Sequence, residues 1–417
     1  MRVGEMRHEE RAPFGKPLAG VRVLAVEQMQ ALPYATQLLA HLGAEIVKVE
    51  HPERGDTGRA SRPALTDRDG RTVGATFLRN NLSKRSVGLD LKHAEGRALF
   101  LRMVPRFDVV AENMRAGAME RLGLGYEALA GAHPGLVYVS ISGFGNLDPS
   151  PYADWPAYAP VAEAMGGLYE PNKRPGRPPP VVVAGALGDN ASALFAVIGT
   201  LAALRERERS GRGQHVDVAM YDAMIAMTDM VPFLWSMGAP AHMAAAGTTA
   251  LVGAFAARDG HFVLAVFREH HFERLARTVG HPEWLDDERL ATREGWARHT
   301  EDLIRPALEA WAADKTKLEA SQLLCEQGVV AGPSNRAEDI AADPHVAARN
   351  MLIEVPRPDD PRPYLVVGNP VKMSRTAEGP VSGFPGLGEH TDEVLRELLA
   401  LSDDELARLR AAGAIGP

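Results

Sequence analysis

Short apolar runs alternate with longer amphipathic stretches through the N-terminal half of the chain. Residues 21–26 (VRVLAV) are typical of a buried strand, and residues 33–43 carry helical spacing between Pro33 and Gly43, which mark a helix start and end. Residues 44–50 (AEIVKVE) predict a second strand. A strand, a helix and a strand in succession indicate a parallel pair.

The same alternation recurs in the runs SVGLDL, DVVAEN and GLVYVSISGFG, and the helical segment HAEGRALFLRMV lies between the first two. The pattern predicts an α/β domain with an open, Rossmann-like parallel sheet. The first strand-to-helix turn, EQMQALPY, lacks the G-x-G-x-x-G glycines that let a backbone approach a pyrophosphate. This disfavours a nicotinamide-linked oxidoreductase, and the fold outline alone indicates no other function.

The pattern changes after residue 228. Residues 235–250 are rich in Gly, Ala, Met and Pro and predict a connector, while ALVGAFAARDGHFVLAVF predicts a hairpin that turns at Arg258–Gly260. Helical segments follow to Gln327, and a chain of 417 residues exceeds one ordinary core. We expect a flexible tail over 1–17, a large Rossmann-like domain over 18–228, a linker and smaller α+β domain over 229–345, and a return to the large domain over 346–417.

Composition narrows the function classes. The chain is 45% hydrophobic and 24% charged, as in a soluble globular enzyme, and its net charge of −8 argues against a nucleic-acid partner. The one cysteine, Cys325, lies outside any Cys/His cluster, so we expect it to be a small core residue and expect no metal site. Residues 1–17 are charged and lack the apolar stretch of a secretory signal, so we expect a cytoplasmic protein.

An acidic residue interrupts the apolar stretch PVVVAGALGDNASALFAVIGTLAAL (180–204) at Asp189. Residues 181–183 predict the start of a buried strand and residues 191–205 a helix buried on most faces, so Asp189 falls at or next to the helix N-cap. From local sequence alone, a capping role is favoured over a chemical one. A membrane span is disfavoured because polar residues lie near its middle.

Five segments carry a resemblance to a known family. They are PLAGVRVLAVEQMQALPYATQLLAHLGAEIVKVEHPERGD (17–56), NNLSKRSVGLDLKHAEGR (80–97), DVVAENMRAGAMERLGLGYEAL (108–129), GALGDNASALFAVIGTLAALRERERSGRGQHVDVAMYDA (185–223) and GLGEHTDEVLREL (386–398). In this order they resemble the family III CoA-transferases, which include formyl-CoA transferase, carnitine CoA-transferase and α-methylacyl-CoA racemase.

The resemblance implies that Asp189, in the motif GALGD, is a nucleophile. Its carboxylate would attack an acyl-CoA thioester to give a mixed anhydride and then an aspartyl-CoA thioester, and an acceptor acid would reverse these steps. We expect the helix N-terminus to keep the carboxylate ionised and apolar walls to exclude water. The resemblance also implies that Gln30 contacts the thioester region; without it, Gln30 is a polar loop residue.

A CoA-binding set also follows from the resemblance, because the phosphates of CoA need cationic partners. The set is His51, Asn81, Lys84, Arg85, Asn113, Met114, Arg115, Arg121 and Tyr158. For each basic residue the alternative is a solvated surface charge. The CoA thioester is then a substrate, and no separate cofactor is expected.

Two departures from formyl-CoA transferases bear on specificity. Ala159 stands where those enzymes carry Glu, and the region 244–253 offers only Gly247 and Gly253 where they have a Gly-rich loop. We therefore expect a different acid substrate, and the identity of the donor and acceptor stays open.

Two alternatives remain from the sequence. An α-methylacyl-CoA racemase pairs the aspartate with an upstream histidine, but Asp154 stands at that place, and Glu269 resembles a further acidic residue of the racemase site. An inactive acyl-CoA binder on the same fold is the non-enzyme alternative. The resemblance implies an interlocked homodimer that takes an acyl-CoA and a small carboxylic acid. From the charge and the polar residues described above, we expect no nucleic-acid or membrane partner.

Overall fold

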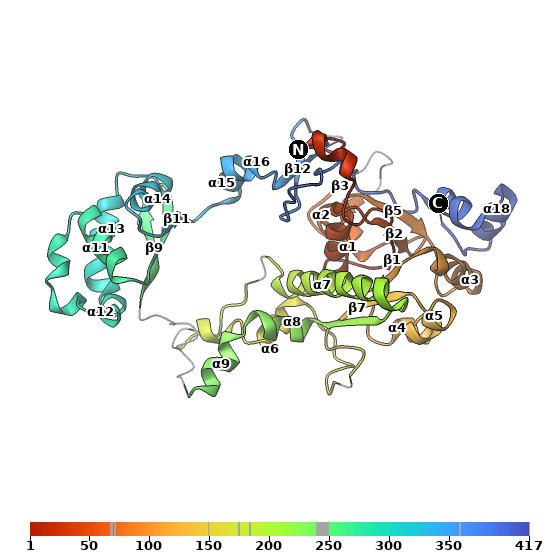
Figure 1. Cartoon of the computed structure of the whole chain (residues 1–417), viewed down its shortest axis with the longest axis horizontal. Coiled ribbons are helices and arrows are strands. Elements are labelled where there is room, and N and C mark those ends of the chain that lie inside the picture. The colour runs from red at the N-terminus through yellow and green to blue at the C-terminus, as the bar shows by residue number, and fades with distance from the viewer. Residues whose placement is uncertain are drawn as a thin grey trace. The chain divides into compact units, whose positions relative to one another are not determined.

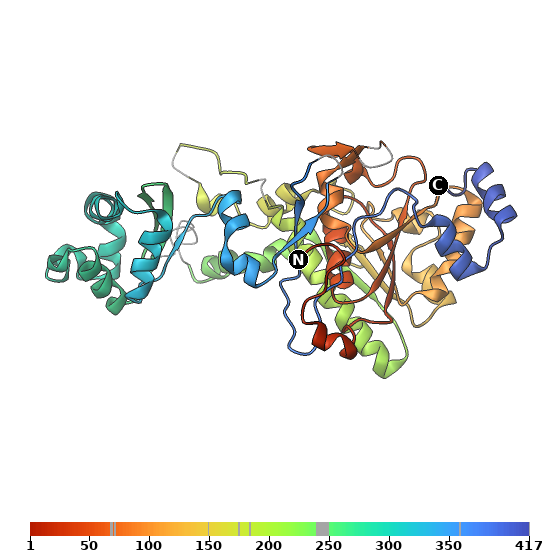
Figure 2. The same cartoon turned by 90° about the horizontal axis from the view of Figure 1, so that it is seen from above.

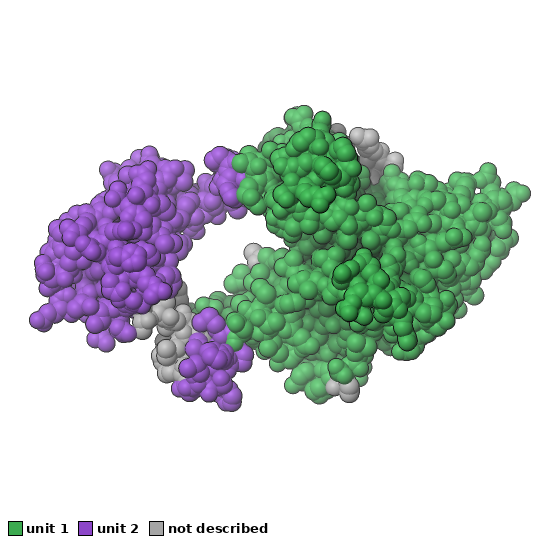
Figure 3. All heavy atoms as spheres, in the orientation of Figure 1, with its two compact units in different colours: residues 1–229, 347–417 green, residues 230–346 purple. Residues whose placement is uncertain are grey.

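The computed structural model describes residues 1–66, 70, 72–148, 150–173, 176–182, 185–238, 250–357 and 360–416. Contacts divide the chain into two compact units, and Figure 3 shows them in two colours. Unit 1 comprises residues 1–229 and 347–417, and unit 2 comprises residues 230–346.

Unit 1 is built on a six-stranded parallel sheet with the strand order β5-β2-β1-β6-β7-β8. The strands are β1 (Arg22–Val26), β2 (Glu45–Glu50), β5 (Lys84–Gly88), β6 (Val109–Glu112), β7 (Val137–Ser142) and β8 (His215–Ala219). Renumbered in chain order this is 3-2-1-4-5-6, the doubly wound order in which ligands bind outside the carboxyl ends of the strands where the order reverses. That point lies between β1 and β6.

Helices cover both faces of this sheet, and two small hairpins complete the unit. The helices are α1 (Ala31–His41), α2 (Ala75–Asn80), α3 (Ala94–Met103), α4 (Ala118–Arg121), α5 (Tyr126–Ala132), α6 (Ala159–Met165), α7 (Leu187–Ser210), α8 (Met220–Met227), α17 (Thr391–Leu399) and α18 (Asp403–Ala411), with short 3-10 turns η1 (Glu9–Phe14), η2 (Thr57–Ala60), η3 (Val104–Arg106) and η4 (Glu170–Asn172). The hairpins pair β3 (Ala64–Thr66) with β4 (Thr72–Gly74) and β12 (Leu352–Val355) with β13 (Tyr364–Val367).

Alternate residues of the strands enter two different cores. Leu24 packs with Phe100 of α3, while the neighbouring Val23 packs with Leu39 of α1 and Ala196 of α7. Figure 1 shows α1 and α7 side by side, and Figure 2 shows the C-terminal helices beside α3. Because successive side chains of a strand point to opposite faces, burial on both faces explains why the strands read as unbroken apolar runs.

Unit 2 holds a three-stranded antiparallel sheet in the order β11-β10-β9. Its strands are β9 (Leu251–Ala257), β10 (Gly260–Val266) and β11 (Ala331–Pro333), and its helices are α9 (Met230–Ser236), α11 (Glu269–Thr278), α12 (Arg293–Arg298), α13 (Arg305–Ala312), α14 (Lys317–Glu326) and α15 (Ala337–Ala342), with η5 (Pro282–Leu285), η6 (Glu288–Leu290) and the π-helix η7 (Thr300–Ile304); α16 (Pro344–Ala348) ends in unit 1. The predicted hairpin is confirmed, because β9 and β10 pair across Arg258 and Asp259. Phe272 stacks on Trp296 in the core, with ring centroids 4.4 Å apart.

Three local predictions are corrected. Residues 1–17 do not form a loose tail, because the Arg7 N–H donates to the Glu378 carbonyl (2.8 Å) and Arg2 bridges to Glu354. Residues 181 and 182 are exposed and belong to no strand, and residue 183 lies outside the described residues. Cys325 is exposed, since α14 buries its neighbour Leu324 instead. The first correction depends on contacts between residues far apart in the sequence, which no local pattern reveals.

Helix α7 is the one helix, in the described ranges, that is long and apolar enough to cross a membrane by length and composition. Its 24 residues pack against α1, β7, β8 and α8, and 44% of its most apolar window is buried in the protein. Its C-terminal end follows the expectation for glycine, because Gly211 adopts a left-handed conformation (φ 72°) just beyond Ser210.

Candidate active site

The connection from β1 to α1 forms one side of the candidate site. Gln30 is buried at the N-cap position of α1, four residues after β1 ends at Val26. Its Nε2 donates to Asn190 Oδ1 (3.2 Å), and the guanidinium of Arg79 donates to its Oε1. The structure thus brings together the β1–α1 loop, α2 and the first turn of α7, where Asn190 follows Asp189.

Asp189 is the third residue of α7 and lies half-buried in its first turn. Burial and, to a smaller extent, the nearby Glu163 carboxylate raise the pKa of its carboxyl to about 6, against the opposing effect of the Arg79 cation. The helix N-terminus was expected to keep Asp189 ionised, but burial and Glu163 outweigh its effect on the pKa. The carboxylate is held at the site at a free-energy cost, which is a frequent property of reactive groups.

Glu163 of α6, and not Asp189, accepts a hydrogen bond from a free backbone N–H in the first turn of α7. The Glu163 side chain is buried, its Oε1 accepts the Gly188 N–H (2.9 Å), and its Oε2 accepts the Tyr169 hydroxyl. The N-cap position is Ala186, which makes no side-chain cap bond. The local preference for Asp as a cap is corrected here, because a carboxylate 25 residues upstream takes that role.

Gly188 permits this arrangement of α6 and α7. A Cβ placed on Gly188 would lie 3.1 Å from Cα of Ala159 and 3.2 Å from its carbonyl oxygen. A larger residue would push the two helices apart and break the bond from the Gly188 N–H to Glu163. The glycine in GALGD therefore sets the position of Asp189 through helix packing.

A cavity of about 300 Å³ opens at the carboxyl ends of the neighbouring strands β1, β2 and β5, and we call it the strand-end cavity. Its wall includes residues 26–28 after β1, His51 after β2, and Met114 after β6. The Nδ1 of His51 accepts the Glu53 N–H (3.2 Å), which orients the imidazole. This is the position where a doubly wound sheet binds its ligand, and Gln30 follows two residues after the cavity wall.

Two other lining residues were missed by the sequence reasoning. Lys92 and Arg54 both border the cavity. Lys92 follows the carboxyl end of β5, whereas the predicted Lys84 begins that strand. The rule that ligands bind at carboxyl ends could have selected Lys92 over Lys84 once the strand was assigned.

Lys84 and Asn81 are placed inside the protein. The Lys84 ammonium is buried and donates to Glu27 Oε1 (2.7 Å), the Pro33 carbonyl (2.9 Å) and Asn81 Oδ1 (3.0 Å). Burial lowers the pKa of Lys84 to about 8. With Lys48 these groups form a buried ionic cluster beneath the β1–α1 loop, and neither Lys84 nor Asn81 lines the cavity.

The remaining members of the predicted set occupy separate places. Asn113 clamps the β1 loop, because its Oδ1 accepts the Gln28 N–H and its Nδ2 donates to the Gln28 carbonyl, both at 2.9 Å. Arg85 pairs with Glu45, Glu393 and Glu397, Arg115 donates to the Asp154 carbonyl (3.1 Å), Arg121 donates to the Ala116 carbonyl (3.4 Å), and Tyr158 is exposed before α6. Their predicted contacts with CoA stay predictions.

Two acidic residues, Asp154 and Glu269, were considered for proton transfer, and Asp154 is exposed in unit 1. Glu269 belongs to unit 2 and forms a two-bond ion pair with Arg293 (2.7 and 2.9 Å). Within the described residues, the charges that shift the pKa of Asp189 are those of Glu163 and Arg79, and no histidine is among them. The region 239–249, including Gly247, lies outside the described residues. The described residues contain no group of three or more His, Cys, Asp or Glu able to hold a metal ion.

Comparisons with known proteins agree with one another. The sequence profile of CoA-transferase family III matches residues 18–391. The succinyl-CoA–D-citramalate CoA-transferase of Chloroflexus aurantiacus is 36% identical over 95% of this chain and 97% of its own, and the succinyl-CoA:mesaconate CoA-transferase of Haloarcula hispanica is 37% identical over 91% and 96%. A crystal structure of a CAIB/BAIF family protein from Brucella suis superposes with a TM-score of 0.79 at 32% identity, covering 92% of this chain and 99% of that one.

Proposed function

The chain belongs to CoA-transferase family III, and on that premise we propose that it moves CoA from an acyl-CoA donor to a carboxylic acid through a covalent intermediate on Asp189. The observation that carries this proposal is the placement of Asp189. Its half-buried carboxylate sits in the first turn of α7 beside Asn190, which accepts a hydrogen bond from Gln30, and Gln30 follows the cavity-lining residue Gln28 by two positions. A reactive carboxylate and a ligand cavity thus share one edge of the sheet.

The proposed first half-reaction releases the donor acid. An oxygen of Asp189 attacks the thioester carbonyl carbon, the C–S bond breaks, and an aspartyl mixed anhydride and a CoA thiolate form. The thiolate then attacks the aspartyl carbonyl of the anhydride, the bond from that carbonyl to the bridging oxygen breaks, and the donor leaves as a carboxylate. An aspartyl-CoA thioester remains on the enzyme. One negative charge is conserved in every step and no proton is transferred, so no general base is required.

The second half-reaction uses the same groups in reverse. The acceptor carboxylate attacks the aspartyl-CoA thioester and expels CoA thiolate, and that thiolate attacks the acceptor carbonyl of the new anhydride. Acceptor acyl-CoA leaves, and the Asp189 carboxylate is restored. The reaction therefore needs one site that holds an oxyanion and protects an anhydride from water.

Gln30 is suited to holding the oxyanion. Its Oε1 is taken by Arg79, so the amide is oriented with Nε2 toward Asn190 and the start of α7. In the proposed mechanism this N–H donates to the carbonyl oxygen on which charge develops, and the dipole of α7 adds to the effect. Removing one such donor typically lowers kcat by about a hundredfold or more.

We further propose that the strand-end cavity holds the nucleotide part of CoA. His51, Arg54 and Lys92 supply polar and cationic groups, and Met114 supplies an apolar wall. This combination suits a phosphorylated ligand with an aromatic base. For the reacting acids we propose succinyl-CoA as donor and a short dicarboxylic acid as acceptor, because the two relatives named above use succinyl-CoA by name.

A homodimer is part of the proposal. Leu194, Ile198 and Leu201 form an exposed apolar stripe along α7, while the opposite side of the helix packs into unit 1. Their spacing of four and three residues places them on one helix face. A second copy of the chain that packs against this stripe would bury its apolar side chains. Light scattering is expected to measure twice the mass of one chain.

The test separates transferase from racemase chemistry. Asp189→Ala is expected to lose transfer from succinyl-CoA while CoA still binds, and Asp154→Asn, a change at the exposed carboxylate of the racemase alternative, is expected to keep transfer. Succinyl-CoA turnover in deuterium oxide is expected to leave the α-carbon unlabelled. Deuterium entering the α-carbon without net transfer would favour the racemase.

A further inference from the structure

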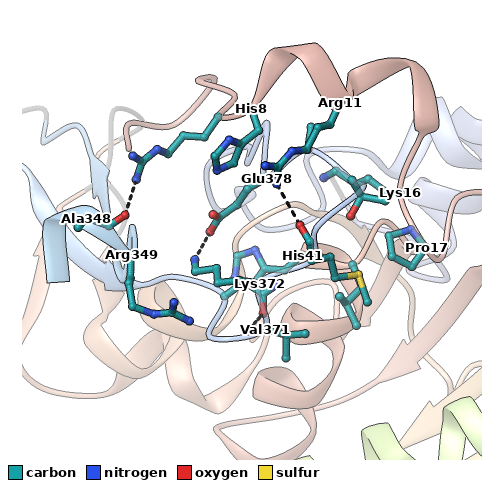
Figure 4. A pocket seen from close by; sticks show the side chains of 16 residues that line it. His8, Arg11, Lys16, Pro17, His41, Ala348, Arg349, Val371, Lys372 and Glu378 are labelled. Atoms are coloured by element: carbon teal, nitrogen blue, oxygen red, sulfur yellow. Dashed lines mark hydrogen bonds and ion pairs between the residues drawn. The ribbon is translucent and has the colours of Figure 1, made fainter. Parts of the chain in front are cut away.

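A second cavity, of about 200 Å³, is lined by none of the residues of the candidate active site (Figure 4). Three segments of unit 1 line it: the N-terminal residues 7–17, the end of α1 at His41, and the returning segment 348–378. None of its lining residues belongs to the strand-end cavity or to the group around Asp189. Its volume is several times the roughly 30 Å³ that one water occupies in the liquid.

The lining of this cavity is strongly basic. Arg7, Arg11, Lys16, Arg349 and Lys372 line it, and Glu378 is the only acidic residue among the lining residues of the described chain. The whole protein carries a net charge of −8, so this concentration of cations runs against its overall balance. A hollow lined by one sign of charge attracts ligands of the opposite sign.

Two of these five cations, Lys372 and Arg11, pair with carboxylates. Lys372 pairs with Glu378 (2.5 Å) and Arg11 with Glu10 (3.3 Å). Arg7 donates to a backbone carbonyl of the returning segment, at Ala347 (3.3 Å), and Arg11 donates to another, at Met373 (3.2 Å). Bonds to carbonyls leave the charge of a guanidinium in place. These two contacts also join the N-terminal segment to the returning segment across the cavity, as Figure 4 shows for Arg11.

Two further cations have no carboxylate partner in the described residues. Lys16 makes one long contact, to the Pro380 carbonyl (3.5 Å), and Arg349 has no hydrogen bond or ion pair there. Figure 4 shows both side chains at the same cavity, from opposite segments. The pKa of Lys16 is lowered because it is buried.

His41 adds a buried polar atom without a partner. Its Nε2 is inaccessible to solvent and, within the described chain, makes no hydrogen bond. Burial, together with the nearby Lys16 and Lys372 cations, lowers the pKa of His41 to about 4. An unpaired buried nitrogen and crowded cations are each unfavourable, and an anion in the cavity would relieve both.

We propose that this basic cavity is a binding site for a small, multiply charged oxyanion of the phosphate class, held by Lys16 and Arg349 and flanked by Arg11 and Lys372. The ligand is either free phosphate or the phosphoryl group of a small monoester. Binding would hold the N-terminal segment against the returning segment and so stabilise unit 1. This inference does not depend on the proposed reaction at Asp189.

The test titrates inorganic phosphate into the intact protein by isothermal calorimetry at constant ionic strength. The variants are Arg349→Gln and Lys16→Gln, and the matched control is Arg209→Gln, an exposed arginine at the end of α7. Wild type and control are expected to bind equally, and each cavity variant about tenfold or more weakly. All four proteins are expected to retain CoA transfer, which shows that they are folded.

Two further arms identify the ligand. Glycerol 1-phosphate binding more tightly than phosphate would assign the site to a phosphoryl group, and equal binding would assign it to the free ion. Phosphate binding is expected to persist in saturating CoA. Displacement by CoA, equal phosphate affinity in all four proteins, or no phosphate binding at all would overturn the proposal; the last includes the case in which a second copy of the chain fills the cavity.

Discussion

Two groups of charged residues near the β1–α1 loop, one buried and one partly exposed, differ in how far their charges are balanced. In the cluster of Glu27, Asp56, Lys48 and Lys84, burial alone would raise the pKa of both carboxyls, but the lysines lower it. Around Asp189, burial and the Glu163 carboxylate outweigh the one nearby cation, Arg79, and the pKa of Asp189 is raised to about 6. The first group is compensated and holds the loop in place, while the second is left uncompensated at the site of proposed chemistry.

The largest expected effect comes from removing the uncompensated carboxylate. Asp189→Asn is expected to lower kcat by at least about a thousandfold, because the nucleophile is lost. It is also expected to stabilise the fold at pH 8. A carboxyl whose pKa is raised on folding contributes stability at low pH that is lost as pH rises through about 6, so its replacement removes a penalty there.

Urea unfolding at pH 8 measures that second effect, which we expect to be about 1 to 3 kcal/mol in favour of the variant. Asp154→Asn serves as the control at an exposed position. Unchanged activity in Asp189→Asn would show that Asp189 is not the nucleophile.

The compensated cluster should respond in the opposite way. Lys84→Met leaves Glu27 with one of its two lysine partners and is expected to destabilise the protein by about 3 kcal/mol or more. Activity per folded molecule is expected to persist, since Lys84 does not line the strand-end cavity. The free energy of unfolding and the active-site titre measure the two quantities. A rise in KM for acyl-CoA at unchanged stability would instead return Lys84 to the CoA-binding set.

Lys92→Gln sharpens the comparison between the two ends of β5. Lys92 borders the cavity, so the variant is expected to raise KM for acyl-CoA about tenfold with little change in kcat or stability. Steady-state kinetics and thermal unfolding give these values. A stability loss without a KM effect would show that Lys92 supports the fold and does not contact CoA.

The smallest expected effect is a shift in pH dependence. Transfer requires ionised Asp189, so kcat/KM is expected to fall as pH falls through about 6. Glu163→Gln removes the neighbouring negative charge but keeps an oxygen that accepts the Gly188 N–H, so the acidic limb is expected to move to lower pH. A pH–rate profile of both proteins reads the shift. An unmoved limb would mean that Glu163 acts only on the packing of α6 against α7.

The sequence predicts the features that depend on local pattern. Apolar runs and intervening helices indicate the parallel sheet, the β9–β10 hairpin is placed at the observed turn, and Asp189 is assigned to the start of a helix. What it could not predict depends on residues far apart in the chain. Glu163 reaches Gly188 across 25 residues, and Arg7 meets Ala347 across 340.

The basic residues show the same limit most clearly. Lys84 and Lys92 lie eight positions apart and carry the same charge, yet one is buried under the loop and the other borders the cavity. Charge alone does not distinguish them; the direction of β5 does, because it places Lys92 beyond the carboxyl end. The side-chain partners of a buried lysine are fixed by tertiary packing, which the local sequence does not contain.

The central claim, a covalent intermediate on Asp189, is tested most directly by trapping. The protein is incubated with succinyl-CoA and hydroxylamine, and peptides are mapped by mass spectrometry, with Asp189→Asn as control. The account predicts a hydroxamate on Asp189 in the wild type and on no carboxylate in the variant. An unmodified Asp189 in protein that turns over succinyl-CoA and an acceptor acid would contradict it.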